Sequence, residues 1–294
     1  MAGLKRSSGL VRWVPLLWLG SFFLAPFLIV LKISLSEQAT ARPPYRPVFD
    51  PAAGWDGFVA ALGQLSPANF INVLTDDLLW GAYLTSLRIA AISTVLALIL
   101  GLAIALPMAR APRRWQPWLV MLVILPFLTS FLIRAYAWIG ILKPEGLLNL
   151  VLIKSGLIST PLAVFNTDLA VIIGIVYSYL PFMILPLYAS LEKFDAGLLE
   201  AASDLGARPG AAFFLVTLPV IWPAVLAGCA LVFIPAMGEF VIPDLLGGSD
   251  TLMVGKVVMT TFFADRDWPL ASAMAIILLA IVLVPILIRQ ARTA

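Results

Sequence analysis

"EAASDLGARPGAAFFLVTLP", Glu200 to Pro219, is a polar, glycine-containing stretch that lies between two long apolar runs. Around its first half, four apolar residues follow the i, i+3, i+4, i+7 spacing that places side chains on one face of a helix: Leu198, Ala201, Ala202 and Leu205. The residues therefore predict a short helix with a narrow apolar stripe of mostly small side chains.

The second half of this stretch carries the signals of a turn followed by another helix. Gly206 suits the left-handed backbone position that ends a helix, and Pro209 suits the first turn of the next one. A rigid protrusion lined by alanine permits close approach of a partner protein, while flanking charges set its register. On the residues alone, an ordinary amphipathic surface helix remains equally consistent.

Composition places the chain in a membrane. Of 294 residues, 62% are hydrophobic and only 12% are charged, and the mean hydropathy is +1.02. Soluble domains carry about 25% charged residues, so we expect an all-α integral membrane protein. The net charge of +3 fits cytoplasmic loops that anchor membrane spans, and we expect no nucleic-acid partner.

Apolar runs of the length that crosses a hydrocarbon core occur six times. They cover residues 13–31, 89–109, 117–133 (extending past Arg134), 169–191, 221–238 and 268–288. Prolines within these runs predict kinks more than breaks. The expected fold is six transmembrane helices in a single transmembrane domain, 1–294, with an uncleaved first span.

The distribution of Lys and Arg predicts the orientation of the chain. With both termini in the cytoplasm, ten basic residues lie inside on short segments: Lys5, Arg6, Arg12, Arg110, Arg113, Arg114, Lys193, Arg208, Arg289 and Arg292. Seven lie outside on longer segments: Lys32, Arg42, Arg46, Lys143, Lys154, Lys256 and Arg266. Loop 36–77 is then extracytoplasmic, and loop 192–217, which contains the opening stretch, is cytoplasmic.

Several kinds of chemistry are excluded by the residues present. The chain has no histidine and one cysteine, Cys229, so imidazole-based catalysis, imidazole metal sites and internal disulfides are excluded. Gly255-Lys256 is a near miss to a phosphate-binding loop, because Asp250 and Val257 occupy positions where Gly and Ser or Thr are required. We therefore expect no catalytic residues, no metal site and no cofactor in this chain.

The opening stretch resembles a known family signature. Glu200-Ala201-Ala202, three residues, Gly206, nine residues, Val216, one residue and Leu218-Pro219 are similar to the EAA motif of ABC importer permeases of the MetI-like (type I) fold. Val216 in place of Ile is the only departure. In that family the loop is a coupling helix that docks on a separate ATPase. The resemblance implies this role for Glu200, Ala201, Ala202, Leu205, Gly206 and Arg208.

Three further segments resemble the putrescine and spermidine permeases of that family, the putrescine-type subunit in particular. They are "LPFLTSFLIRAYAWIGIL" (125–142), "IPAMGEFVIPDLLGG" (234–248) and "RDWPLASAMAI" (266–276). The resemblance implies binding-protein-dependent polyamine transport across a bacterial inner membrane. Permeases for another small cation or an opine-like solute remain an alternative, as does an ATP-independent carrier or channel.

The resemblance also implies partners. Six spans with one coupling loop form half of a pathway, so a second, homologous permease subunit is expected, together with a dimer of ATP-binding subunits that holds ATP and Mg²⁺. Substrate is expected to arrive on an extracytoplasmic binding protein. ATP binding and hydrolysis would then drive alternating access.

One ionisable residue near the outer end of the fifth span is a candidate for the cation route. Glu239 carries a carboxylate that can attract an alkylammonium, and ionisable residues at membrane depth face a bundle interior or a wet cavity. Aromatic residues that could add cation–π contact are Phe240, Tyr136, Trp138, Tyr177 and Tyr179, and Asp244 could assist by attraction. The alternative is a salt bridge from Glu239 to Arg134 or Arg88, two arginines expected to be structural and to reach the outer interface.

Overall fold

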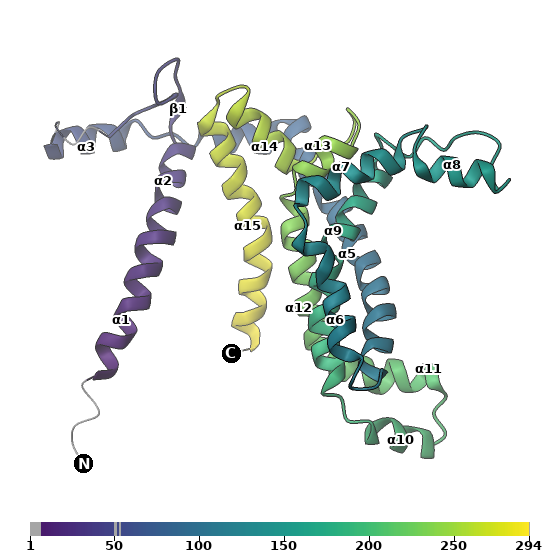
Figure 1. The fold of residues 1–294 in the computed structure, drawn as a ribbon. Coiled ribbons are helices and arrows are strands. Elements are labelled where there is room, and N and C mark those ends of the chain that lie inside the picture. Colours follow the sequence, from purple (N-terminus) through teal and green to yellow (C-terminus); the bar gives the residue numbers. More distant parts are fainter. Residues whose placement is uncertain (1–6, 50–51, 53, 294) are drawn as a thin grey trace, which may run out of the picture. The chain divides into compact units, whose positions relative to one another are not determined.

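The computed structural model describes residues 7–49, 52 and 54–293, and it is mostly helical. Figure 1 shows the course of the chain. The chain divides into two compact units. One contains the residues up to Gly81 together with those from Val257 onward, and the other runs from Ala82 to Lys256.

The first unit contains the first and last long helices of the chain. Its elements are α1 (Ser7–Leu19), the π-helical turn η1 (Gly20–Leu24), α2 (Ala25–Ser34), β1 (Glu37–Gln38), β2 (Tyr45–Arg46), α3 (Gly54–Gly63), α4 (Ala68–Thr75) and α15 (Trp268–Thr293). Helix α15 packs against α2 and α4. The two short strands pair antiparallel, with Glu37 opposite Arg46.

The second unit is a helical bundle. Its elements are α6 (Gln116–Ile124), η3 (Leu125–Leu128), α7 (Phe131–Leu142), α8 (Leu147–Lys154), α9 (Asp168–Glu192), α10 (Gly197–Asp204), α11 (Pro209–Ala212), η4 (Phe213–Thr217), α12 (Leu218–Met237) and α13 (Val241–Leu246). Most of α5 (Asp77–Arg110) and the first residues of α14 (Val254–Phe263) also belong to it.

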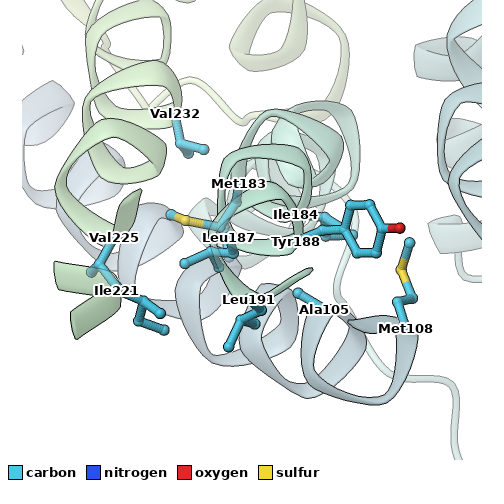
Figure 2. Packing of buried hydrophobic residues seen from close by; sticks show 11 residues of the cluster. Ala105, Met108, Met183, Ile184, Leu187, Tyr188, Leu191, Ile221, Val225 and Val232 are labelled. Carbon is cyan, nitrogen blue, oxygen red and sulfur yellow. The ribbon is translucent and has the colours of Figure 1, made fainter. Parts of the chain in front are cut away.

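Helices α5, α9 and α12 form the core of this bundle. Met183 of α9 is fully buried, and its side chain lies in a space that any Cβ at Gly101 of α5 or Gly228 of α12 would enter, at 2.7 Å from Met183 Cγ or Sδ. Figure 2 shows Met183 directed toward α12 and Tyr188 directed toward Met108 of α5. Small residues at such contacts let membrane helices approach closely and pack by dispersion.

The two ends of the bundle carry different features (Figure 1). Helices α10 and α11 lie at the end where α9 finishes and α12 begins, whereas α7 and α13 lie at the opposite end, near the start of α9 and the end of α12. Any site next to α13 is therefore separated from α10 by the length of the bundle.

The apolar helices agree with a six-span protein, with differences of detail. Among the described residues, seven stretches are long and apolar enough to cross a membrane, and five of them contain most of the predicted spans 13–31, 89–109, 169–191, 221–238 and 268–288. The other two are Gly54–Thr75, which lies in the predicted extracytoplasmic loop and is interrupted between α3 and α4, and Phe131–Lys154. The predicted span 117–133 corresponds to a shorter apolar stretch, Gln116–Leu128. The third predicted span does not continue past Arg134. It ends in η3, and Thr129 is extended (φ −91°, ψ 155°), so α7 starts as a new helix at Phe131.

Candidate functional site

Glu239 lies in the short break between α12 and α13, and its carboxylate is held by three donors. Its side chain is buried, with 6% of the residue exposed. One carboxylate oxygen accepts the backbone N–H groups of Val241 (3.0 Å) and Ile242 (3.4 Å), and the other accepts the hydroxyl of Tyr179 on α9. A buried charge of this kind is costly unless it is hydrogen-bonded, and these donors fix its position.

A pocket of about 410 Å³ opens beside this carboxylate. Residues from η3, α7, α9 and the end of α12 line it: Phe127, Phe131, Arg134, Ser178, Tyr179, Phe182, Pro235, Gly238, Glu239, Phe240 and Val241. Five of them are aromatic, and their rings offer the negative faces that attract cations. The arrangement joins one fixed carboxylate to an aromatic wall, which suits an organic cation.

The alternative of a salt bridge between Glu239 and an arginine is wrong for this structure. Arg88 forms its ion pair with Asp168, at the start of α9. Arg134 donates from Nη1 to the carbonyl oxygen of Pro126 at 2.7 Å instead. Among the described residues, Glu239 has no ion-pair partner within 4.0 Å.

Arg134 lies in the pocket, where its guanidinium stacks on aromatic rings. The guanidinium carbon is 4.7 Å from the ring centre of Phe127 and 5.9 Å from that of Phe131. The side chain is half-buried and lines the same pocket as Glu239. That Arg134 reaches the outer interface stays a prediction.

The backbone of Gly238 and Glu239 is braced by the first turn of α14. A Cβ at Gly255 would lie under 3.0 Å from the carbonyl oxygens of both residues, so only glycine permits this approach. The N–H of Val254 donates to the buried hydroxyl of Ser86 on α5 at 2.8 Å, which holds this turn in place. The dipeptide Gly255-Lys256 resembles part of a phosphate-binding loop in sequence. In the structure, Gly255 has a packing role.

The other predicted route residues are distributed unevenly. Phe240 lines the pocket, but Tyr136 is 59% exposed and lies outside it. Trp138 and Tyr177 pack edge to face, with ring centres 5.4 Å apart, and do not line the pocket. Asp244 forms an ion pair with Lys256 at 3.4 Å.

Sequence reasoning missed three rings of the pocket. Phe127, Phe131 and Phe182 were not singled out, although Phe127 and Phe131 are four residues apart beside an arginine. Tyr179 was noted only as a nearby aromatic residue, yet it makes a direct hydrogen bond to Glu239. The spacing of Tyr179 and Phe182, i and i+3 on a helix, is the signal that could have identified them.

At the opposite end of the bundle, the opening stretch folds as helix, turn and helix. Gly206 has φ +81°, which confirms the predicted left-handed position. The N–H of Gly206 donates to Ser203 O (2.9 Å) and that of Ala207 to Ala202 O (3.0 Å), the paired bonds of a Schellman cap. Pro209 is the first residue of α11, as predicted.

The exposed face of α10 carries a leucine near each end of the helix. Leu205 is 89% exposed and Leu198 is 43% exposed, whereas Ala202 is 9% exposed and packs toward its own chain. Glu200 and Arg208 are also exposed. Part of the predicted stripe therefore faces outward, where a partner can reach it, and part anchors the helix.

Comparisons with known proteins identify the family. The model of the family "Binding-protein-dependent transport system inner membrane component" matches residues 3–291. The chain is 40% identical to the spermidine/putrescine transport system permease protein PotB of Haemophilus influenzae over 88% of this chain and 84% of that protein. It is 44% identical to the PotB protein of Escherichia coli K12 over 70% of this chain and 74% of that protein.

A solved structure shares the fold. The crystal structure of a bacterial ABC transporter involved in the import of the acidic polysaccharide alginate contains a chain that aligns with a TM-score of 0.69 at 17% identity. The alignment covers 98% of this chain and 96% of that chain. This protein therefore belongs to the binding-protein-dependent transport system inner membrane component family, as a multi-pass permease of the ABC importer fold.

Proposed function

We propose that this chain is one permease subunit of an ATP-driven importer for polyamines such as putrescine and spermidine. The observation that carries the proposal is the 40% to 44% identity to spermidine/putrescine permeases over most of the chain. The buried carboxylate in an aromatic pocket supports the same substrate class, because alkylammonium groups favour a fixed anion and ring faces.

In this proposal the pocket beside Glu239 lies on the substrate route. Glu239 supplies the counter-charge, and Phe240 together with the other rings contacts the alkyl chain and the ammonium group. Asp244 and the aromatic residues Tyr136, Trp138 and Tyr177 lie outside the pocket, so we assign them to the approach to it. A site of this kind must bind strongly enough to admit the cation and weakly enough to release it.

The α10–α11 segment is assigned to energy coupling. Glu200, Ala201, Ala202, Leu205, Gly206 and Arg208 would dock on a separate ATPase dimer, which holds ATP and Mg²⁺. The protruding Leu205 and the capped, rigid turn at Gly206 support this assignment. The bundle would then transmit the conformational change of the ATPase dimer to the pocket at its other end.

The remaining partners complete the pathway. We assign the chain a second, homologous permease subunit, since one bundle provides half of a translocation path. A binding protein would deliver the substrate on the outer side, and both termini would be cytoplasmic, as the distribution of basic residues indicates.

The test is uptake into proteoliposomes that contain the chain, its ATPase, the second permease and the binding protein. Labelled putrescine, cadaverine and spermidine are compared with butane-1,4-diol, the neutral counterpart of putrescine. We expect ATP-dependent accumulation of the polyamines and none of the diol. Accumulation of another organic cation without polyamines, or polyamine flux through the chain alone without ATP, would contradict the proposal.

A further inference from the structure

Arg134 makes unusually few polar contacts for a half-buried arginine. Among the described residues, its guanidinium donates one hydrogen bond, from Nη1 to Pro126 O at 2.7 Å, and stacks over Phe127 and Phe131. Its Nε is buried and has no hydrogen-bond partner among the described residues. Buried polar groups are normally satisfied, so this side chain is held mainly by its contact with the rings.

The single hydrogen bond does not explain why an arginine is present. The carbonyl oxygen of Pro126 already accepts the hydroxyl of Thr129 at 2.7 Å and its backbone N–H at 3.3 Å. Loss of the guanidinium would therefore leave no carbonyl unsatisfied at this turn. By contrast, Arg88 neutralises Asp168 directly.

Arg134 and Glu239 share one pocket without forming an ion pair. The carboxylate of Glu239 is fixed by Tyr179 and by two backbone N–H groups. The guanidinium is fixed on the rings of Phe127 and Phe131, and about 410 Å³ of space adjoins both groups. Two of the five rings in the pocket, Phe127 and Phe131, thus already contact a cation of the protein.

We propose that Arg134 is an internal competitor for the ammonium group of the substrate. In the empty pocket its guanidinium occupies the cation position over Phe127 and Phe131, and an entering alkylammonium displaces it while Glu239 supplies the counter-charge. The competition weakens binding, which lets the cation leave the pocket during transport. This inference rests on the proposed function, and it adds a role for the Arg134 guanidinium in the pocket.

The experiment measures binding of n-butylammonium, a minimal alkylammonium probe, to the purified, nucleotide-free importer complex by calorimetry. n-Butanol serves as the neutral probe. The variants are Arg134→Gln, which removes the charge, and Arg134→Lys, which keeps it. Lys154→Gln is the matched control, because it removes one positive charge from an exposed position on α8, outside the pocket.

Arg134→Gln is expected to bind n-butylammonium about 2- to 30-fold more tightly than the unmodified complex, the range that corresponds to one cation–π contact. Arg134→Lys and Lys154→Gln should stay within about twofold, and n-butanol binding should not change. Equal, weaker or undetectable n-butylammonium binding in an assembled Arg134→Gln complex overturns the proposal.

Assembly is checked by size-exclusion chromatography. If Arg134→Gln fails to assemble, Arg134→Met, which has an unbranched, uncharged side chain, is measured instead. Failure of both variants to assemble means that the guanidinium is structural, and it also overturns the proposal. If the proposed function is wrong, the experimental result is different. The unmodified complex then transports no polyamine, whatever effect Arg134→Gln has on n-butylammonium binding.

Discussion

Tyr179 of α9 donates its hydroxyl hydrogen to the carboxylate of Glu239, a residue 60 positions later in the chain. This hydrogen bond joins the middle of one core helix to the break that follows another. Among the described residues that line the aromatic pocket, it fixes the one carboxylate. The geometry of the pocket therefore depends on the packing of α9 against α12.

Tyr179→Phe removes this donor and leaves the rest of the ring in place. We expect a loss of stability of about 1 to 3 kcal/mol, because a buried charged acceptor loses one of its three donors. Thermal unfolding of the purified complex measures this. Tyr177→Phe is the control, since its ring packs on Trp138 and its hydroxyl makes no hydrogen bond to the described residues. Equal unfolding temperatures for the two variants would contradict the assigned role.

Gly255→Ala tests the close contact between the first turn of α14 and the backbone of Gly238 and Glu239. The new methyl group would lie under 3.0 Å from two carbonyl oxygens, and we expect a cost of about 1 to 3 kcal/mol together with reduced polyamine uptake. Gly140→Ala on α7 is the control, because a Cβ there would meet no atom of the described residues within 4 Å apart from its chain neighbours and its own helix backbone. Unfolding temperature and uptake, at matched membrane expression, report both effects. Normal behaviour of Gly255→Ala would show that the approach is not required.

Gly206→Val tests the coupling segment. A β-branched residue at φ +81° is strained by about 1 to 3 kcal/mol, and this strain would misdirect α11. We expect normal membrane insertion with weaker association of the ATPase, or loss of transport, measured by copurification and uptake. Gly210→Ala, at a helical position of α11, should behave normally. Unchanged uptake by Gly206→Val would rule out the coupling role.

The sequence predicted the local features of the fold well. The cap at Gly206, the start of α11 at Pro209 and the apolar spans follow from short-range rules of backbone conformation and hydropathy. The break at Thr129 was missed because a proline in an apolar run is equally consistent with a kink. The backbone leaves the helix there, and hydropathy does not register such a change.

The candidate site was only partly accessible from the sequence. Glu239 and Phe240 stood out because an ionisable group in an apolar run is conspicuous. Their partners come from η3, α7 and α9, and nothing in a single sequence reports contacts between segments so far apart. For the same reason, the pairing of Arg88 with Asp168, 80 residues away, could not be anticipated.

Arg88 is predicted to have a structural role. It pairs with Asp168, which also accepts the hydroxyl of Thr251 at 2.6 Å, so the group joins α5, α9 and the loop before α14. Both charged side chains are substantially exposed, and we expect Arg88→Ala to cost less than about 1 kcal/mol. Arg88→Lys should be tolerated better in unfolding and uptake assays. Equal, complete loss of transport in both variants, with folding intact, would indicate a gate instead.

Uptake of labelled putrescine by the complete importer carrying Glu239→Gln tests the central claim most directly. The amide keeps the size of the side chain but removes the counter-charge, so we expect kcat/KM to fall about tenfold or more, with a partial loss for Glu239→Asp. Glu145→Gln, at an exposed loop position, is the control and should transport normally. Because Glu239 and Arg134 form no ion pair, the double change Glu239→Arg with Arg134→Glu should not restore uptake. The account predicts an assembled Glu239→Gln complex that binds its ATPase but loses putrescine flux, and an unchanged KM and rate in that complex would contradict it.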